Sequence, residues 1–199
     1  MKTLLIDSIG CLSVTPEQIN ESMQQNNGKV ILSGVMQRAD ATNQNGRQYP
    51  EDILRREADK YKQVFVTERR ALGELDHPDS SVVNLQNVSH NVVDLWWNGG
   101  DLMGKIEILS TPSGNIAKEL LKSGIRLGIS SRGMGSVRNI GEGKVEVQDD
   151  FEIVCWDLVS NPSTQGAFMN NLNENKGHVV VDNKYSKINS LIGDIISLM

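Results

Sequence analysis

The stretch GISSRGMGS, residues 128–136, stands among a series of short segments with the character of β-strands. Strands are expected at 125–131, 135–139, 144–148 and 151–159, and the turn residues GEG at 141–143 join the middle two. Short strands in sequence, separated by glycine-containing turns, are typical of antiparallel sheets. We therefore expect this half of the chain to form an antiparallel sheet around residues 128–136.

The sequence before this stretch adds further strands and two helices. The turn NGGD, residues 98–101, lies between the apolar segments 90–97 and 102–109 and predicts a hairpin, and residues 29–36 predict another strand. A helix is expected from Pro50 to Lys62, and a second from Ser113, as its N-cap, to Lys122. Mostly antiparallel strands with two helices indicate an α+β or small-barrel layout.

The chain divides into three zones. With 199 residues and 38% hydrophobic content it can bury one substantial core, so we expect a single folded domain at 28–169. Residues 1–27 end in a polar, asparagine- and glutamine-rich tract and are expected to form a flexible lead-in. Residues 170–199 are expected to form a polar linker followed by an amphipathic helical tail. The apolar face of that tail comprises Ile188, Leu191, Ile192, Ile195, Ile196 and Leu198.

Charge and cysteine content exclude several classes of protein. The net charge of −5 and the pI near 5.2 argue against direct nucleic-acid binding. We find no apolar span long enough for membrane insertion and no secretory signal. Cys11 and Cys155 lack metal-ligand spacing, and the histidines lack zinc spacing, so no metal or cofactor is expected. A reducing, cytoplasmic setting is the default expectation.

Three segments carry the parts of a serine hydrolase. His77 lies in GELDHP at residues 73–78, the pair Ser130 and Ser131 lies in residues 128–136, and Asp157 lies in WDLVSNPS at residues 156–163. A serine hydroxyl is a weak nucleophile at neutral pH and needs an imidazole within hydrogen-bond reach, held by a third group. The chain thus holds a base, a nucleophile and an acid.

Strand periodicity favours Ser131 over Ser130. Successive side chains of a strand point to opposite faces, so Ser131 continues the apolar row of Leu127 and Ile129. Asp157 is a charged residue within the apolar row of the strand expected at residues 151–159. A buried carboxylate is costly unless it is hydrogen-bonded or paired, and an imidazole N–H is a fitting partner.

Other interpretations of the same residues stay open. Each of the three side chains, taken alone, is more often an ordinary loop, strand-end or ion-pairing residue, and His90 is an alternative base. The glycine-rich residues 128–136 could form an anion cradle, which would make the chain a phosphate-binding module, although the lysine of a P-loop is missing. A noncatalytic structural core protein is the remaining alternative.

Four segments, at residues 45–50, 73–78, 128–136 and 156–163, resemble the prohead core proteases of T-even-type tailed phages. The resemblance covers roughly residues 28–168 and keeps the order of the motifs. These proteases resemble more distantly other phage prohead proteases and herpesvirus assemblin. The resemblance implies an antiparallel β-barrel flanked by helices, and a serine endopeptidase that cuts scaffold, core and capsid precursors during capsid maturation inside the prohead, in the host cytoplasm.

The resemblance also implies roles for single residues. His77 is the implied general base and Asp157 the third member. Ser131 is the preferred nucleophile, because Ser131-Arg132-Gly133 matches the serine, any residue, glycine pattern of the wider group, with Ser130 as the alternative. Arg132 and Gly133 are candidates for the oxyanion hole or substrate binding.

Family cleavage is implied to follow a glutamate preceded two positions earlier by leucine or isoleucine. Glu21 and Glu174 fit this pattern in polar segments, so both are candidate autocleavage sites of a self-processing zymogen. The implied partners are scaffold and core proteins and the major capsid protein precursor. Assemblin relatives form dimers, and the sequence leaves a homo-oligomer open.

Overall fold

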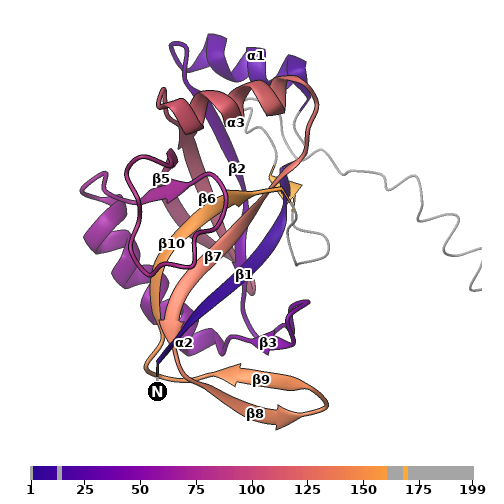
Figure 1. Cartoon of the computed structure of the whole chain (residues 1–199), viewed down its shortest axis with the longest axis vertical. Helices are drawn as coiled ribbons and strands as arrows, with labels where there is room; N and C mark the ends of the chain where they lie inside the picture. Colours follow the sequence, from indigo (N-terminus) through magenta and orange to yellow (C-terminus); the bar gives the residue numbers. More distant parts are fainter. Residues whose placement is uncertain (1, 13–14, 161–167, 170–199) are drawn as a thin grey trace, which may run out of the picture.

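The computed structural model describes residues 2–12, 15–160 and 168–169, and their strands form three sheets (Figure 1). The first sheet has the order β10-β7-β1-β11, the second β2-β6-β5-β4 and the third β3-β9-β8. Most neighbouring strands are antiparallel, whereas the pairs β1–β11 and β3–β9 are parallel. The α+β class with mostly antiparallel strands is confirmed.

The helices and strands occur in a fixed order along the chain. They are β1 (Thr3–Leu12), α1 (Pro16–Gln25), β2 (Val30–Arg38), β3 (Arg47–Gln48), α2 (Glu51–Tyr61), the π-helical turn η1 (Lys62–Val66), β4 (Leu72–Glu74), β5 (Val88–Asn98), β6 (Asp101–Ile108), α3 (Pro112–Lys122), β7 (Leu127–Gly135), β8 (Val137–Gly141), β9 (Lys144–Val147), β10 (Glu152–Val159) and β11 (Phe168–Met169). Figure 1 shows α1 and α3 together at one end of the molecule and the β8–β9 hairpin at the other.

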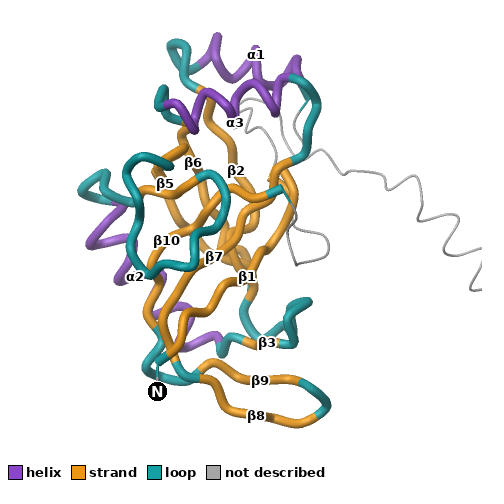
Figure 2. The backbone as a smooth tube through the Cα atoms, in the orientation of Figure 1, coloured by secondary structure: helices purple, strands orange, loops and turns teal. Residues whose placement is uncertain are grey.

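The expected closed barrel is not found among the described strands. The first and second sheets are separate, and a parallel bridge between Leu75 and Leu158 joins β4 to β10. The backbone N–H of Asp76 donates to the carbonyl of Leu158 at 2.7 Å beside this bridge. The end of β4 therefore lies against β10, and the loop that follows β4 crosses the first sheet (teal in Figure 2).

The flexible lead-in expected at residues 1–27 is wrong for the residues that the structure describes there. Residues 3–12 form β1, which pairs with β7 along most of its length, and residues 16–25 form α1. The side chain of Thr15 accepts from the backbone of Gln18, and the Gln18 side chain accepts from the backbone of Thr15, which is a capping box. The strand was missed because its pairing partner lies more than 100 residues away in the sequence. The domain boundary at residue 28 consequently divides a single folded unit.

The other helices and hairpins agree with the sequence predictions, except that the N-cap of one helix lies two residues earlier than expected. The helix after Pro50 and the hairpin at residues 98–101 are present as expected. The second expected helix is α3, whose N-cap is Thr111 rather than Ser113: the Thr111 hydroxyl accepts from the backbone N–H of Gly114, and Pro112 occupies the first helical position. The tail expected at residues 170–199 lies outside the described residues.

Large apolar side chains fill the interior between the sheets and α2. Trp156 is fully buried and packs edge-on against Tyr61, with ring centroids 5.0 Å apart. Phe151 packs edge-on against Tyr49 at 5.2 Å. These aromatic contacts fix β10 against α2 and the loop before it, so the backbone that carries Asp157 is held in a rigid setting. Within the described part of the chain, no helix has the length and apolar character needed to cross a membrane.

Candidate active site

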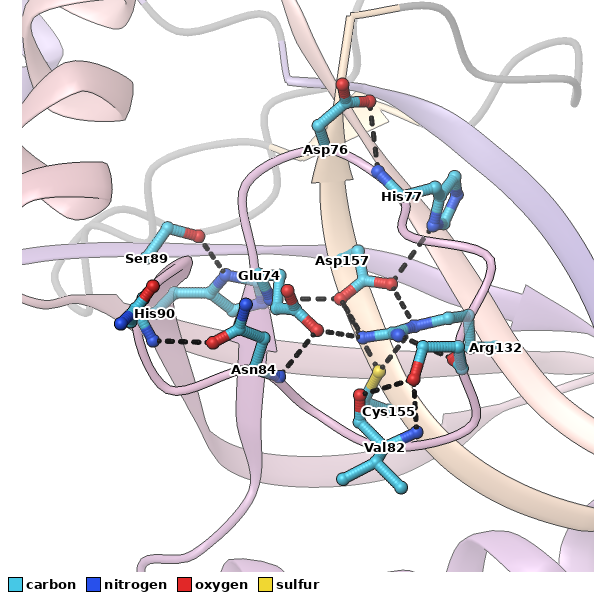
Figure 3. A network of polar contacts seen from close by, with 12 residues as sticks. Glu74, Asp76, His77, Val82, Asn84, Ser89, His90, Arg132, Cys155 and Asp157 are labelled. Carbon is cyan, nitrogen blue, oxygen red and sulfur yellow. Dashed lines mark hydrogen bonds and ion pairs between the residues drawn. The ribbon is translucent and has the colours of Figure 1, made fainter.

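His77, Ser130 and Asp157 meet where β7 and β10 pass under the loop that follows β4. Asp157 and Ser130 are direct partners in the β10–β7 ladder, so their side chains point to the same face of the sheet. The Nδ1 atom of His77 lies 3.0 Å from Oδ2 of Asp157 (Figure 3), and Nε2 is hydrogen-bonded to the Ser130 hydroxyl. An ionised carboxylate only accepts, so Nδ1 carries the proton and Nε2 is left to accept from Ser130.

The adjacent serine, Ser131, lies on the opposite face of β7. It is paired with Trp156 of β10 and with Asp7 of β1, and its hydroxyl donates to the carbonyl of Asp7 at 3.3 Å. The geometry therefore replaces the preferred serine of the sequence analysis with its neighbour. The reason is the strand register. Asp157 is paired with Ser130 in the β10–β7 ladder, so these two side chains lie on the same face of the sheet, and Ser131 lies on the other face.

Asp157 is fully buried, and several donors surround its carboxylate. Its Oδ1 accepts from the backbone N–H of Glu74 at 2.9 Å and from Arg132 at 3.1 Å, and its Oδ2 forms an ion pair with Arg132 at 2.7 Å. Burial acts to raise the pKa of Asp157, but the hydrogen bonds from His77 and Glu74 and the charge of Arg132 hold that pKa below its ordinary value. The acid is therefore ionised at neutral pH and can hold the imidazole in one tautomer.

Arg132 does not point toward a substrate. Its guanidinium is fully buried and contacts Glu74 at 2.7 Å, the carbonyl of Ser80 at 2.8 Å and the sulfur of Cys155 at 3.2 Å, in addition to Asp157. Burial acts to lower the pKa of Arg132, but Cys155, Asp157 and Glu74 outweigh it and raise that pKa, so the side chain keeps its charge. These contacts use the donors that an oxyanion hole would need, so the structure does not support the role expected from the sequence.

Gly133 has a packing role in this structure. A Cβ atom at this position would lie 2.3 Å from the Phe151 ring and 2.8 Å from the carbonyl of Glu152. Only a residue without a side chain lets β10 and Phe151 approach this closely. The glycine is thus explained without contact to a substrate.

The loop between β4 and β5 holds His77 from both sides. Asp76 adopts a left-handed backbone with φ of 72°, and its carboxylate accepts from the backbone N–H of His77 at 2.9 Å. Before the histidine, the loop is fixed to Leu158, and after it the carbonyl of Ser80 is fixed to Arg132. The His77 side chain is 17% exposed, which leaves an edge of the ring open to the surface.

His90, the alternative base, is fully buried on β5. Its Nδ1 lies 2.9 Å from the Ser89 hydroxyl, and burial lowers the pKa of His90 to about 4. The ring is therefore neutral at physiological pH and packs against Gly73 of β4. The structure thus brings His77, rather than His90, to the serine pair.

Two other sequence expectations differ from the structure. Residues 128–135 do not form an anion cradle, because they belong to β7, whose backbone is paired with β1 on one side and β10 on the other. Glu21 lies within α1 instead of an extended segment, and the next residue, Ser22, is buried with its hydroxyl bonded to the backbone of Ile31. Glu174 lies outside the described residues.

Glu74 is the site residue that sequence reasoning missed. It is fully buried, binds Arg132 through Oε1 and donates its backbone N–H to Asp157. The available signal was its place three residues before His77 in the segment at residues 73–78. Its importance depends on a partner 58 residues away, which local sequence does not show. Within the described residues, no group of three or more histidine, cysteine or acidic side chains forms a metal site.

Comparisons with known proteins identify relatives of this chain. A sequence profile of the family described as prohead core protein serine protease matches residues 6–176. The prohead core protein protease of Enterobacteria phage T4 is 32% identical over 144 residues, which span 70% of this chain and 68% of the relative. The solved structure of the bacteriophage T4 capsid assembly protease, gp21, matches with a TM-score of 0.69 and 25% identity, over 81% of this chain and 99% of that one. This chain therefore belongs to the prohead core protein serine protease family.

Proposed function

We propose that this chain is a serine endopeptidase of capsid maturation that uses Ser130 as nucleophile, His77 as general base and Asp157 as the group that orients the imidazole. The hydrogen bonds that join Asp157 to His77 and His77 to Ser130 carry the proposal. They have the order that hydroxyl activation requires. The names of the similar T4 proteins add the setting, which is the prohead and capsid assembly.

In the proposed reaction, the Ser130 oxygen attacks a peptide carbonyl while its proton moves to Nε2 of His77. The imidazolium, held by Asp157, then gives this proton to the leaving amine, and an acyl-enzyme forms. Water attacks the acyl-enzyme, again losing a proton to Nε2, and the collapse of the second tetrahedral intermediate returns that proton to Ser130. The Asp157 carboxylate stays ionised throughout.

The proposed substrates are scaffold and core proteins and the precursor of the major capsid protein, cut after glutamate inside the prohead. A pocket that binds a substrate glutamate would use a cation, and Arg132 is not free for this role because it is buried and bound to two carboxylates. Arg69, Arg70 and Arg138 are exposed, and each forms an ion pair, with Glu107, Glu68 and Glu146 respectively. Exposed ion pairs are weak, so a substrate glutamate can replace such a partner.

The decisive experiment compares alanine variants of the two adjacent serines. We expect Ser130→Ala to lower kcat/KM for a peptide with an isoleucine, any residue, glutamate sequence by a factor on the order of 10⁴ or more. Ser131→Ala is the matched control and should stay within about tenfold of the parent, because it loses only a structural hydrogen bond worth about 1 kcal/mol.

Labelling by a fluorophosphonate should follow the same pattern, with loss in Ser130→Ala and in His77→Ala and retention in Ser131→Ala. If the parent chain, after incubation that allows self-processing, neither hydrolyses the peptide nor takes the label, the chain is a structural core protein rather than an enzyme. If Ser131→Ala is the inactive variant, the nucleophile assigned here is wrong.

We also propose that the chain is made as a zymogen that processes itself. Ser130 has no exposed surface in the full-length chain, so a substrate carbonyl reaches its hydroxyl only after the surrounding segments move. Glu21 lies in a capped helix, and a protease needs an extended segment, so cleavage there requires α1 to unfold. We therefore expect cleavage after Glu174 to precede cleavage after Glu21.

Intact-mass spectra taken over time on the parent chain and on Ser130→Ala test this order. The parent should first lose the residues that follow Glu174, and the variant should keep both ends. Intact termini in both samples would argue against self-processing, and an early loss of residues 1–21 would contradict the proposed order.

A further inference from the structure

One buried guanidinium, that of Arg132, contacts every segment that builds the active site. We infer that Arg132 and Glu74 form a positioning pair: Arg132 fixes the histidine loop and the acid relative to the nucleophile strand, and Glu74 offsets the Arg132 charge so that the charge of Asp157 remains available to His77. This inference rests on the proposed function and assigns a role to two side chains that do not touch the reacting atoms.

The positioning part follows from the contacts. Arg132 stands two residues after Ser130 on β7, so both side chains project from the same face. Its Nε contacts Asp157 on β10 at 2.7 Å, its Nη2 contacts Glu74 at 2.7 Å, and its Nη1 donates to the carbonyl of Ser80 at 2.8 Å. Glu74 lies three residues before His77 (Figure 3), and Ser80 lies three residues after it. One side chain thus fixes both ends of the loop segment that carries the base.

The electrostatic part follows from the number of charges. Glu74, Arg132 and Asp157 are all fully buried, and their formal charges sum to one negative charge. Without Glu74, the guanidinium would cancel the carboxylate that an imidazolium at His77 requires. With Glu74 present, a proton on His77 brings the cluster to neutrality. Buried charges interact strongly because little water screens them, so this balance affects the base directly.

The other titratable groups around the cluster leave this balance unchanged at neutral pH. Burial raises the pKa of the Cys155 thiol and of the Tyr61 hydroxyl, and burial lowers the pKa of His90 to about 4, so all three are neutral. Asp76, in the loop, is an exposed carboxylate that binds the backbone N–H of His77. Asp79, in the same loop, is also exposed, and water screens both.

Glu74 is also held by its own surroundings, which makes it a fixed counter-charge. Its Oε1 accepts from the backbone N–H of Asn84 at 3.0 Å as well as from Arg132, and its backbone N–H donates to Asp157. A glutamine at this position keeps the size and can still accept from Arg132 and Asn84. Glu74→Gln therefore removes a charge with little change of shape, whereas Glu74→Asp keeps the charge and shortens the side chain.

The test is the proton titration of the His77 ring by NMR, measured in a Ser130→Ala background, where no turnover is needed. The His77 signal is assigned by its loss in His77→Gln. Glu74→Gln should move the titration midpoint of His77 to lower pH, and Arg132→Gln should move it to higher pH, each on the order of one pH unit. Arg38→Gln, in an exposed ion pair with Asp101, is the control and should move it by less than about 0.2 unit.

Activity measurements on chains with Ser130 intact separate geometry from charge. Glu74→Asp and Arg132→Lys keep the charges, so the acid limb of kcat/KM against pH should stay in place while kcat falls about 100-fold at unchanged KM. These two variants also serve if a neutralised variant fails to fold. Midpoints that move in the same direction in Glu74→Gln and Arg132→Gln, or conservative variants with parental kcat, would overturn the inference. Absent turnover in the parent chain would count against the proposed function alone, since the NMR shifts do not depend on it.

Discussion

Ser130 and Ser131 are neighbours in sequence but lie in different environments. Ser130 shares a face of the first sheet with Asp157, Arg132 and the His77 ring, whereas Ser131 faces β1 and binds the carbonyl of Asp7. Burial of the charged residues around Asp157 carries a large desolvation free energy, because three full charges are removed from water and each needs a partner. For single residues, the ionisation of a buried group is the property that an experiment can measure.

The buried imidazole of His90 should make the stability of the chain depend on pH. Its folded pKa of about 4 lies below the ordinary value of 6.5, so the unfolded state binds more protons between these limits. The contribution is fully present above about pH 6.5 and decreases as the pH falls toward 4, by up to about 3 kcal/mol. Urea unfolding at pH 7.5 and pH 4.5 measures it.

The control for this prediction is His90→Gln, which cannot take up a proton. We expect the parent to lose more stability than His90→Gln between the two pH values, although the variant should be the less stable protein at pH 7.5. Equal losses in the two proteins would show that other groups cause the acid sensitivity.

At the level of secondary-structure elements, the site depends on the contact between β4 and β10. The two strands come from different sheets, and the bridge between Leu75 and Leu158 brings them together. Gly73 of β4 makes the approach possible: a Cβ atom there would lie 2.0 Å from the carbonyl of Trp156 and 2.4 Å from the His90 ring. His77 follows only four residues later, so the contact between β4 and β10 sets the position of His77.

Gly73→Ala should therefore reduce both stability and activity. We expect a loss of about 2–3 kcal/mol, because backbone and a buried ring must shift to admit the methyl group, and a kcat reduced about 100-fold as His77 is displaced from Ser130. Thermal unfolding and peptide hydrolysis measure the two effects. Gly100→Ala, where the nearest atom is 3.9 Å away, is the matched control and should change neither by much.

At the scale of the whole molecule, the amino-terminal strand connects distant parts of the chain. β1 pairs with β7, and the buried carboxylate of Asp7 forms an ion pair with Arg47 at 2.7 Å and accepts from Asn45 at 2.8 Å and from the Tyr49 hydroxyl. The segment at residues 45–50, one of the four motifs, thus contacts β1 from the face of the sheet opposite Ser130 and Asp157. Burial and the charge of Asp7 raise the pKa of Tyr49, which keeps its hydroxyl protonated as a donor.

Removal of residues 2–12 should accordingly prevent cooperative folding. The deletion exposes an edge of β7, removes Leu5 from the core and leaves Arg47 without its carboxylate. We expect loss of the sigmoidal urea transition, measured by tryptophan fluorescence, and loss of hydrolysis. Asp7→Asn removes only the charge and should keep the transition with a stability lower by about 3 kcal/mol. An unchanged midpoint in the shortened chain would contradict this account of β1.

Local signals were sufficient for the α+β class, the hairpins with their turns, α2 and the residue types of the site, because turn chemistry, strand alternation and the family motifs act over short stretches of chain. His77 and Asp157 could be named from those motifs. Only the folded chain shows which serine meets the imidazole, that Arg132 contacts two carboxylates, that Glu74 belongs to the site and that residues 3–12 are a strand of the first sheet. The difference arises from strand register. The alternation of side chains predicts which residues of one strand share a face. Only the pairing of β7 with β10 and β1 shows which residues of different strands lie on the same face of the sheet.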